Sequence, residues 1–321
     1  VGSEMCIRDR LYTVSSHSRF LAMNADDGEI LWEKNLQDYG PVPRYGYSAS
    51  PLIDENRILV LVGDRQKQPG VAAFDRATGE LLWEALDGPT GYASPIIAEI
   101  GGVKQYIFST FVAVLGLSTD GELLWTHETG PKTALPMPVF VAPDTVFVST
   151  ADDQFGGMMV RVTKGEDGFQ TEEVWKERLM RNHFNTSVLI DGHLYGFDNS
   201  TFRCLDAATG DKKWAKRGFG KGSLVAAGNL LYVLSDDGVA ALVHASPEGY
   251  VEAGQMQVME GRSWTAPSLA DGYLYMRDFD EMVVLDVRGD GGAMAAAPAP
   301  ESTIAKMEFG PDGLTLEQIL D

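Results

Sequence analysis

Short apolar runs, each about the length of a β-strand, alternate with polar turn residues along most of the chain. Between residues 185 and 216 the runs are NTSVLI, HLYGF, TFRCLD and DKKWAK, separated by Asp191-Gly192, by Asp198-Asn199-Ser200 and by the turn AATG. Runs of this length, bounded by Asp, Asn, Ser and Gly, are typical of strands joined by tight turns. The pattern therefore predicts a four-stranded antiparallel meander over residues 185–216.

The same order of runs and turns recurs along the chain. Copies begin with SASPLI at Ser48, with YASPII at Tyr92 and with GSLVAA at Gly222. The first copy, from Leu11, supplies only the runs LYTVSS, RFLAMN and EILWEK, and the last, Trp264–Val287, also supplies three. We therefore expect seven recognisable units, of which the first lacks its innermost strand and the last lacks its outermost strand.

A tryptophan closes most of the units, and in four of them a glycine stands four residues before it. Successive tryptophans of the repeat are 39–51 residues apart, which is the period of β-propeller blades. The predicted fold class is thus all-β, a β-propeller of four-stranded antiparallel blades. We expect the glycines to take positive φ at a turn and the rings to pack between neighbouring blades. The positions are Trp32, Trp83, Trp125, Trp175 and Trp214, with Gly28, Gly79, Gly121 and Gly210.

Two turns carry the fullest form of the repeat: AAFDRATGELLW, which ends at Trp83, and CLDAATGDKKW, which ends at Trp214. This motif resembles the tryptophan-docking repeat of PQQ-like β-propellers. From about Leu11 to Val287 the chain is similar to the PQQ-binding-like repeat proteins related to the BamB-type outer-membrane assembly lipoprotein. The resemblance implies eight blades when intact, so about one blade is expected to be missing upstream. It also implies a periplasmic, cell-envelope or secreted protein of a bacterium.

The two ends of the chain differ from the repeats. VGSEMCIRDR (residues 1–10) resembles translated sequencing-adapter sequence ahead of a truncated reading frame, so we expect a non-native leader there and a fragment of a longer protein. The PQQ-like β-propeller is predicted over residues 11–287. Residues 288–321 begin with a Gly/Ala/Pro-rich stretch typical of a flexible linker and end in a C-terminal tail. No signal sequence is visible at this amino end.

Charge narrows the classes of partner. The chain has 46 acidic and 26 basic residues and a formal net charge of −20, and such a surface repels nucleic acid and anionic membranes. No apolar run approaches the roughly 18 residues of a transmembrane segment. We expect a monomer whose partner is a protein or a small ligand.

Candidate chemistry is sparse. The two cysteines are too few for a disulfide framework, and the five histidines lack the spacing of a zinc site. The resemblance leaves open a PQQ-dependent enzyme with calcium, but the vicinal cysteine pair that often lies beside the quinone in those enzymes is absent from the sequence. No catalytic residue, metal or cofactor is therefore expected.

Propeller topology predicts one face for binding, because blade-to-blade connections lie on the same face as the loops between second and third strands. Residues that precede the innermost strands there either ring the mouth of the central channel or pack its bore: Tyr47, Tyr92, Asn182, His183 and Trp264. Among them only His183 is of a residue type expected to titrate near neutrality. We interpret the chain as a non-catalytic binding or scaffold propeller of the bacterial cell envelope. The alternatives are a quinoprotein oxidoreductase and a carbohydrate-binding accessory protein, the latter suggested by the aromatic residues at the channel mouth.

Overall fold

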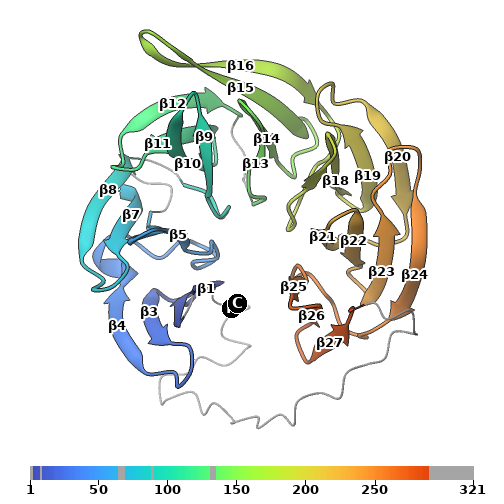
Figure 1. The fold of residues 1–321 in the computed structure, drawn as a ribbon, viewed down its shortest axis with the longest axis horizontal. Coiled ribbons are helices and arrows are strands. Elements are labelled where there is room, and N and C mark those ends of the chain that lie inside the picture. Colours follow the sequence, from blue (N-terminus) through green and yellow to red (C-terminus); the bar gives the residue numbers. More distant parts are fainter. Residues whose placement is uncertain (1–2, 8, 64–68, 88–89, 131–134, 289–321) are drawn as a thin grey trace.

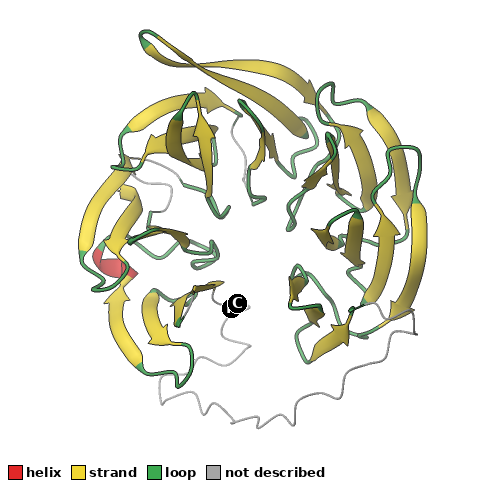
Figure 2. Cartoon of the chain, viewed as in Figure 1, coloured by secondary structure: helices red, strands yellow, loops and turns green. Residues whose placement is uncertain are grey.

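The strands form seven sheets arranged around a central opening (Figure 1). The computed structural model describes residues 3–7, 9–63, 69–87, 90–130 and 135–288. In this part of the chain six sheets have four strands and the last has three. Figure 2 shows that loops and strands account for the described fold apart from the short 3-10 turn η1 (Leu36–Asp38). The prediction of an all-β propeller is confirmed, with seven blades.

The blades follow one another in chain order. Blade one consists of β1 (Ser3–Ile7), β2 (Arg10–Val14), β3 (Arg19–Asn24) and β4 (Ile30–Asn35), and blade two of β5 (Leu52–Asp54), β6 (Arg57–Leu61), β7 (Pro69–Asp75) and β8 (Leu81–Asp87). Blade three consists of β9 (Ile96–Ile100), β10 (Val103–Ser109), β11 (Ala113–Ser118) and β12 (Leu123–Glu128), and blade four of β13 (Val139–Val141), β14 (Thr145–Ser149), β15 (Gly157–Gly165) and β16 (Gly168–Glu177). Blade five consists of β17 (Val188–Ile190), β18 (His193–Asp198), β19 (Thr201–Asp206) and β20 (Lys212–Arg217), and blade six of β21 (Ser223–Ala227), β22 (Leu230–Leu234), β23 (Val239–His244) and β24 (Val251–Gln257). Blade seven consists of β25 (Ser268–Ala270), β26 (Tyr273–Arg277) and β27 (Met282–Asp286).

The first blade corrects one expectation. The sequence predicted three strands there, but β1 pairs antiparallel with β2, from Ser3 opposite Val14 to Ile7 opposite Arg10, and supplies the innermost strand. Strand pairing joins backbone amides and carbonyls and does not require the repeat's side-chain pattern, which is why the pattern did not reveal it. The assignment of residues 1–10 to a non-native leader stays a prediction.

The turn that precedes each outermost strand follows from the repeat motif. In blade two, Asp75 Oδ1 accepts the backbone N–H groups of Ala77 and Thr78 at 2.8 and 2.9 Å. Gly79 then takes φ +71°, a left-handed conformation in which a β-carbon is disfavoured. Asp206 and Gly210 repeat this arrangement in blade five. The short polar turn therefore delivers each tryptophan to a fixed place on its outermost strand.

Four of these tryptophans, Trp32, Trp83, Trp175 and Trp214, reach a turn of the next blade. The indole N–H of Trp125 instead donates to Gln105 Oε1 in its own blade. Trp32, Trp125, Trp175 and Trp214 are buried and Trp83 is half-buried. Three of the indole N–H groups donate to a carbonyl oxygen in the neighbouring blade: Trp32 to Arg76 at 3.1 Å, Trp175 to Ala207 at 2.9 Å, and Trp214 to Ser246 at 2.7 Å. A ring on one blade is thus tied to the backbone of the following one.

Apolar side chains on facing sheets form a core between each pair of consecutive blades. Between blades one and two, for example, the rings of Phe20 and Phe74 lie 5.6 Å apart between centroids. The described residues form six such clusters, one for each consecutive pair. None of these clusters, within the described ranges, joins blade seven to blade one. The same residues include no helix of the length and apolarity that a membrane span requires.

Candidate functional site at the mouth of the channel

One face of the propeller gathers all five residues predicted to lie at the channel mouth. Because the strands of each blade run antiparallel in chain order, the blade-to-blade connections and the loops between second and third strands emerge on the same side. We call this side the connection face. Its described segments are residues 15–18, 36–51, 62–63, 90–95, 110–112, 129–130, 135–138, 150–156, 178–187, 199–200, 218–222, 235–238, 258–267 and 278–281.

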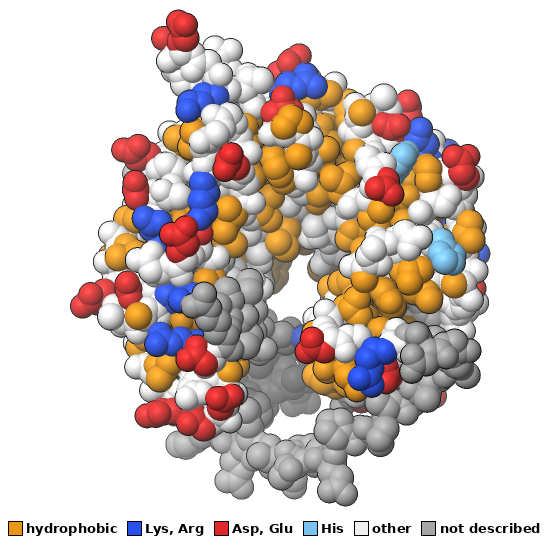
Figure 3. Space-filling view, in the orientation of Figure 1, with side chains coloured by type: hydrophobic (Ala, Val, Ile, Leu, Met, Phe, Trp, Pro, Cys, Tyr) orange, Lys and Arg blue, Asp and Glu red, His pale blue; other side chains and the backbone are white. Residues whose placement is uncertain are grey.

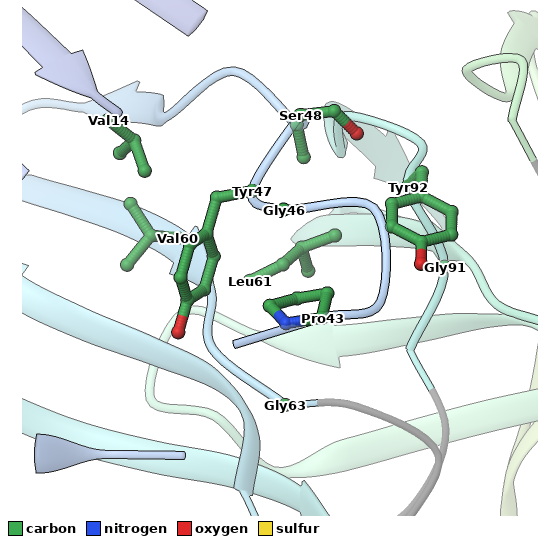
Figure 4. A pocket seen from close by; sticks show the side chains of 11 residues that line it. Val14, Pro43, Gly46, Tyr47, Ser48, Val60, Leu61, Gly63, Gly91 and Tyr92 are labelled. Carbon is green, nitrogen blue, oxygen red and sulfur yellow. The ribbon is translucent and has the colours of Figure 1, made fainter. Parts of the chain in front are cut away.

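Tyr47 and Tyr92 line one small pocket between the first three blades. Figure 4 shows the two rings on opposite sides of Pro43 and Leu61. Tyr47 is buried, and its hydroxyl has no hydrogen-bond partner in the described structure. Burial raises the pKa of Tyr47 to about 12, because the phenolate would lose its hydration. Tyr47 therefore packs the inner wall.

Tyr92 belongs to an aromatic cluster that reaches the surface. Its ring centroid lies 5.8 Å from that of Tyr45 and 5.7 Å from that of Phe111, the latter in an edge-to-face arrangement. The Tyr45 backbone N–H donates to the Tyr92 hydroxyl oxygen at 3.4 Å. Tyr45 is 70% exposed, and the Arg44 guanidinium lies 5.3 Å from its ring centroid. Tyr92 thus anchors an exposed tyrosine.

Asn182 lies in the connection between blades four and five. It is fully buried, and its side-chain amide donates to the carbonyl oxygen of Phe197 at 3.1 Å and accepts from the Ser187 hydroxyl at 3.0 Å. Its backbone N–H donates to the Ser149 hydroxyl at 3.0 Å. These bonds fix the connection between blades four and five. Asn182 therefore positions the next residue, His183, and is not itself presented to a ligand.

His183 and Trp264 are brought together although 81 residues separate them, because Phe184 bridges their rings. The centroid of Phe184 lies 3.8 Å from that of His183 and 4.7 Å from that of Trp264, with 29° between the planes of Phe184 and Trp264. We call His183, Phe184 and Trp264 the aromatic stack. His183 Nδ1 and Trp264 Nε1 are buried and have no hydrogen-bond partner in the described structure.

Two cations flank the aromatic stack. The Lys221 ammonium lies 5.7 Å from the centroid of Phe184, and the Arg262 guanidinium carbon lies 4.8 Å from that of Trp264. Burial lowers the pKa of His183, and the positive charge of Lys221 lowers it further, because both disfavour the imidazolium form. His183 is therefore held toward its neutral form, in which one ring nitrogen donates and the other accepts.

Sequence reasoning missed Phe184, Lys221 and Arg262. Phe184 follows His183 directly and is 40% exposed. The sequence feature that could have indicated it is an aromatic residue within an otherwise polar connection. Lys221 lies in GFGKG and Arg262 in EGRSW, which read as ordinary connections. These residues come together only when blades five, six and seven stand side by side, and no local pattern specifies that arrangement.

The described residues do not fit a calcium–quinone site. No three His, Cys, Asp or Glu side chains among them are grouped so that they could hold a metal. Cys204 is buried in β19, and burial raises the pKa of its thiol to about 11. Hydrophobic side chains gather along the upper and right edges of the central opening in Figure 3, and Ile97 of the innermost strand β9 is 38% exposed. The expectation of no metal and no cofactor stays a prediction.

Comparison with known proteins gives a family and a fold. A family model described as outer membrane protein assembly factor BamB matches residues 7–216. The solved structure of BamB from Moraxella catarrhalis has a TM-score of 0.64 at 15% identity and covers 86% of this chain and 78% of that chain. A search of curated protein sequences gave no match.

Two enzyme structures share the fold at lower identity. A europium-containing methanol dehydrogenase has a TM-score of 0.58 at 12% identity, covering 88% of this chain and 72% of that chain. The quinohemoprotein alcohol dehydrogenase from Comamonas testosteroni has a TM-score of 0.61 at 12% identity, and here 88% of this chain spans 62% of that chain. Likeness at this identity extends to the fold alone.

Proposed function

The chain belongs to the family described as outer membrane protein assembly factor BamB, and from that membership we propose that it is a non-catalytic scaffold that presents its connection face to a protein partner. The cell envelope of a bacterium is the proposed location, since the family's description concerns the assembly of outer membrane proteins. A propeller suits this role because a rigid ring of blades can hold many loops on one surface.

The proposal rests on the exposed apolar side chains of the connection face. Large apolar side chains are exposed on the connection face in five separate segments of the ring. They are Tyr45 (70% exposed), Val112 (43%), Met137 (37%), Phe184 (40%) and Phe279 (74%). Apolar side chains that remain exposed and gather on one face of a folded protein favour an interaction surface for another protein.

Site-specific photo-crosslinking tests the scaffold role. A photoreactive amino acid would replace Phe279, Tyr45 or Leu123 in turn, and the purified protein would be exposed to an envelope extract of a Gram-negative bacterium. Leu123 is the matched control, because it is 56% exposed but lies at the start of β12, on the face of the propeller opposite the connection face. We expect positions 45 and 279 to capture the same protein and position 123 to capture none. Equal capture at all three positions would contradict the proposal.

We also propose that the intact propeller closes with an eighth blade between blade seven and blade one. Every consecutive pair of described blades shares an apolar core, whereas no described cluster joins the last blade to the first. The sheet of blade seven, with three described strands, and the sheet of blade one are therefore the surfaces that a further blade would cover.

A further inference from the structure

The aromatic stack and its two cations come from three different blades. His183 and Phe184 precede β17 of blade five, Lys221 precedes β21 of blade six, and Arg262 and Trp264 precede β25 of blade seven. No two of these blades could form the cluster alone. Because the cluster needs three consecutive blades, it forms only in the folded propeller and is not a local packing motif.

The two cations lack carboxylate partners. In the described part of the chain neither the Lys221 ammonium nor the Arg262 guanidinium forms an ion pair; each has its aromatic contact instead. This is notable in a chain with 46 acidic and 26 basic residues. Two acidic groups of the same loops are already engaged by the backbone: Asp236 accepts the Lys221 N–H at 3.0 Å, and Asp278 accepts the Gly261 N–H at 3.1 Å.

The ring nitrogens of the stack also lack partners. Trp264 Nε1 and His183 Nδ1 are both buried without a hydrogen bond. A buried polar group left unpaired costs about 1–3 kcal/mol, and a ligand that bonds to it removes that cost. An indole N–H can only donate. The missing partner of Trp264 is therefore an acceptor, as is the missing partner of each cation.

We propose that the aromatic stack, together with Lys221 and Arg262, is the recognition site for an acidic segment of the protein partner, in which a carboxylate lies beside an apolar side chain. The inference rests on the proposed scaffold function and adds the chemistry of the partner. The carboxylate would pair with the cations, and the apolar side chain would pack on the exposed part of Phe184. The positive charge of Lys221 already acts on this site, since it lowers the pKa of His183. The same charge would attract such a carboxylate.

Peptide binding to the whole protein tests the site. The probe is a fluorescein-labelled peptide with the core Phe-Asp-Glu-Phe, and its control has the core Phe-Asn-Gln-Phe. The double variant Lys221→Met with Arg262→Met removes both charges and keeps side-chain length. Lys212→Met with Arg217→Met, two exposed cations of β20, is the matched control with the same change in net charge. Far-UV circular dichroism verifies that both variants fold.

We expect the acidic peptide to bind at least about tenfold more tightly than the amide peptide, the first double variant to remove that difference, and the control variant to keep it. The His183 ring resonances should also shift on addition of the acidic peptide. Equal binding of the two peptides, or an equal loss in both variants, would overturn the proposal. Competition by inorganic phosphate at the peptide's own concentration would overturn it too, since the site would then take any anion. Selective peptide binding without crosslinking at positions 45 and 279 would retain this site while refuting the scaffold role.

Discussion

Trp32 lies directly against Gly79 of the next blade, so that a β-carbon on Gly79 would come within 2.8 Å of Trp32 Cδ2. Gly121 meets Trp83 of the preceding blade at 2.8 Å in the same way, and Gly210 meets Trp175 at 2.9 Å. Gly79, Gly121 and Gly210 therefore each accommodate the tryptophan of the blade before them. In the sequence motif a glycine and a tryptophan stand four residues apart. In the structure, however, the glycine of one copy of the motif contacts the tryptophan of the preceding copy.

Replacing Gly79 with alanine is expected to destabilise the protein more than the same change at Gly28. Both residues have positive φ, +71° and +75°, so each variant costs about 1–2 kcal/mol in backbone strain. Only Gly79→Ala also forces a methyl group into the Trp32 ring, which adds about 1–3 kcal/mol; around Gly28 nothing lies within 4 Å. Urea denaturation of the two variants measures the difference, and equal free energies of unfolding would contradict it.

The indole N–H groups of the tryptophans are expected to contribute different amounts to the free energy of unfolding. Replacing a buried tryptophan of the repeat with alanine should cost about 3–5 kcal/mol. With phenylalanine, Trp175→Phe leaves the Ala207 carbonyl oxygen without its donor, whereas Trp83 Nε1 is buried with no partner to lose. Trp175→Phe should therefore lower the free energy of unfolding by about 1 kcal/mol more than Trp83→Phe. A larger loss for Trp83→Phe in chemical denaturation would refute this account.

The repeat predicted most of the fold because its signals are local. Four runs between residues 185 and 216 correspond to β17–β20, and Asp206 and Gly210 form the turn that their residue types favour. The strand β1, which pairs with β2, was missed because its residues do not carry the side-chain pattern of the repeat. Only part of the candidate site was predicted. His183 and Trp264 could be recognised because they precede recognisable innermost strands. Lys221 and Arg262 could not, because they join the site only through contacts made in the folded ring.

A buried acidic group that no sequence pattern revealed holds the connection bearing His183. The Asp198 carboxylate is 1% exposed and accepts from Arg181 Nε at 2.5 Å and from Arg203 Nε at 2.7 Å. Burial raises the pKa of Asp198, but its bonds to Arg181 and the charges of Arg203 and Arg181 outweigh burial, and the pKa is lowered overall. Because the folded pKa lies below the unfolded one, the stabilisation is complete above the unfolded pKa and is lost as pH falls through the folded pKa.

Asp198→Asn is therefore expected to destabilise the protein by about 3–5 kcal/mol near neutral pH, as for other broken buried ion pairs. Its loss of stability between neutral and acid pH should also be smaller than in the unaltered protein. Glu33→Gln is the control, since the Arg19–Glu33 pair is exposed and surface pairs contribute about 0–1 kcal/mol. Thermal melts over a pH series measure both effects. Parallel acid profiles for Asp198→Asn and the unaltered protein would exclude the role given to Asp198.

Mixing the purified protein with PQQ and calcium is expected to produce no oxidation of alcohols or sugars with an artificial electron acceptor. The physical reason is the donor set, because the described residues do not bring three carboxylate, imidazole or thiol groups together, and calcium in proteins takes about 6–8 oxygen ligands. A quinoprotein alcohol dehydrogenase assayed in parallel is the positive control. Saturable turnover that depends on added quinone would show that the chain is an oxidoreductase.

Gly28 offers a test of the eighth blade. At the equivalent turns, Gly79, Gly121 and Gly210 each lie against the tryptophan of the preceding blade, whereas the space around Gly28 is empty. If a further blade precedes blade one in a closed ring, its tryptophan will lie against Gly28. In a version of the protein that carries one further blade ahead of blade one, Gly28→Ala should then become about 1–3 kcal/mol more destabilising than in the present chain, and so match Gly79→Ala. The longer protein should also melt at a higher temperature and scatter light as a monomer, since the sheets of blades one and seven would be covered. An unchanged effect of Gly28→Ala, with equal melting temperatures for the two lengths, would mean that the ring is complete at seven blades.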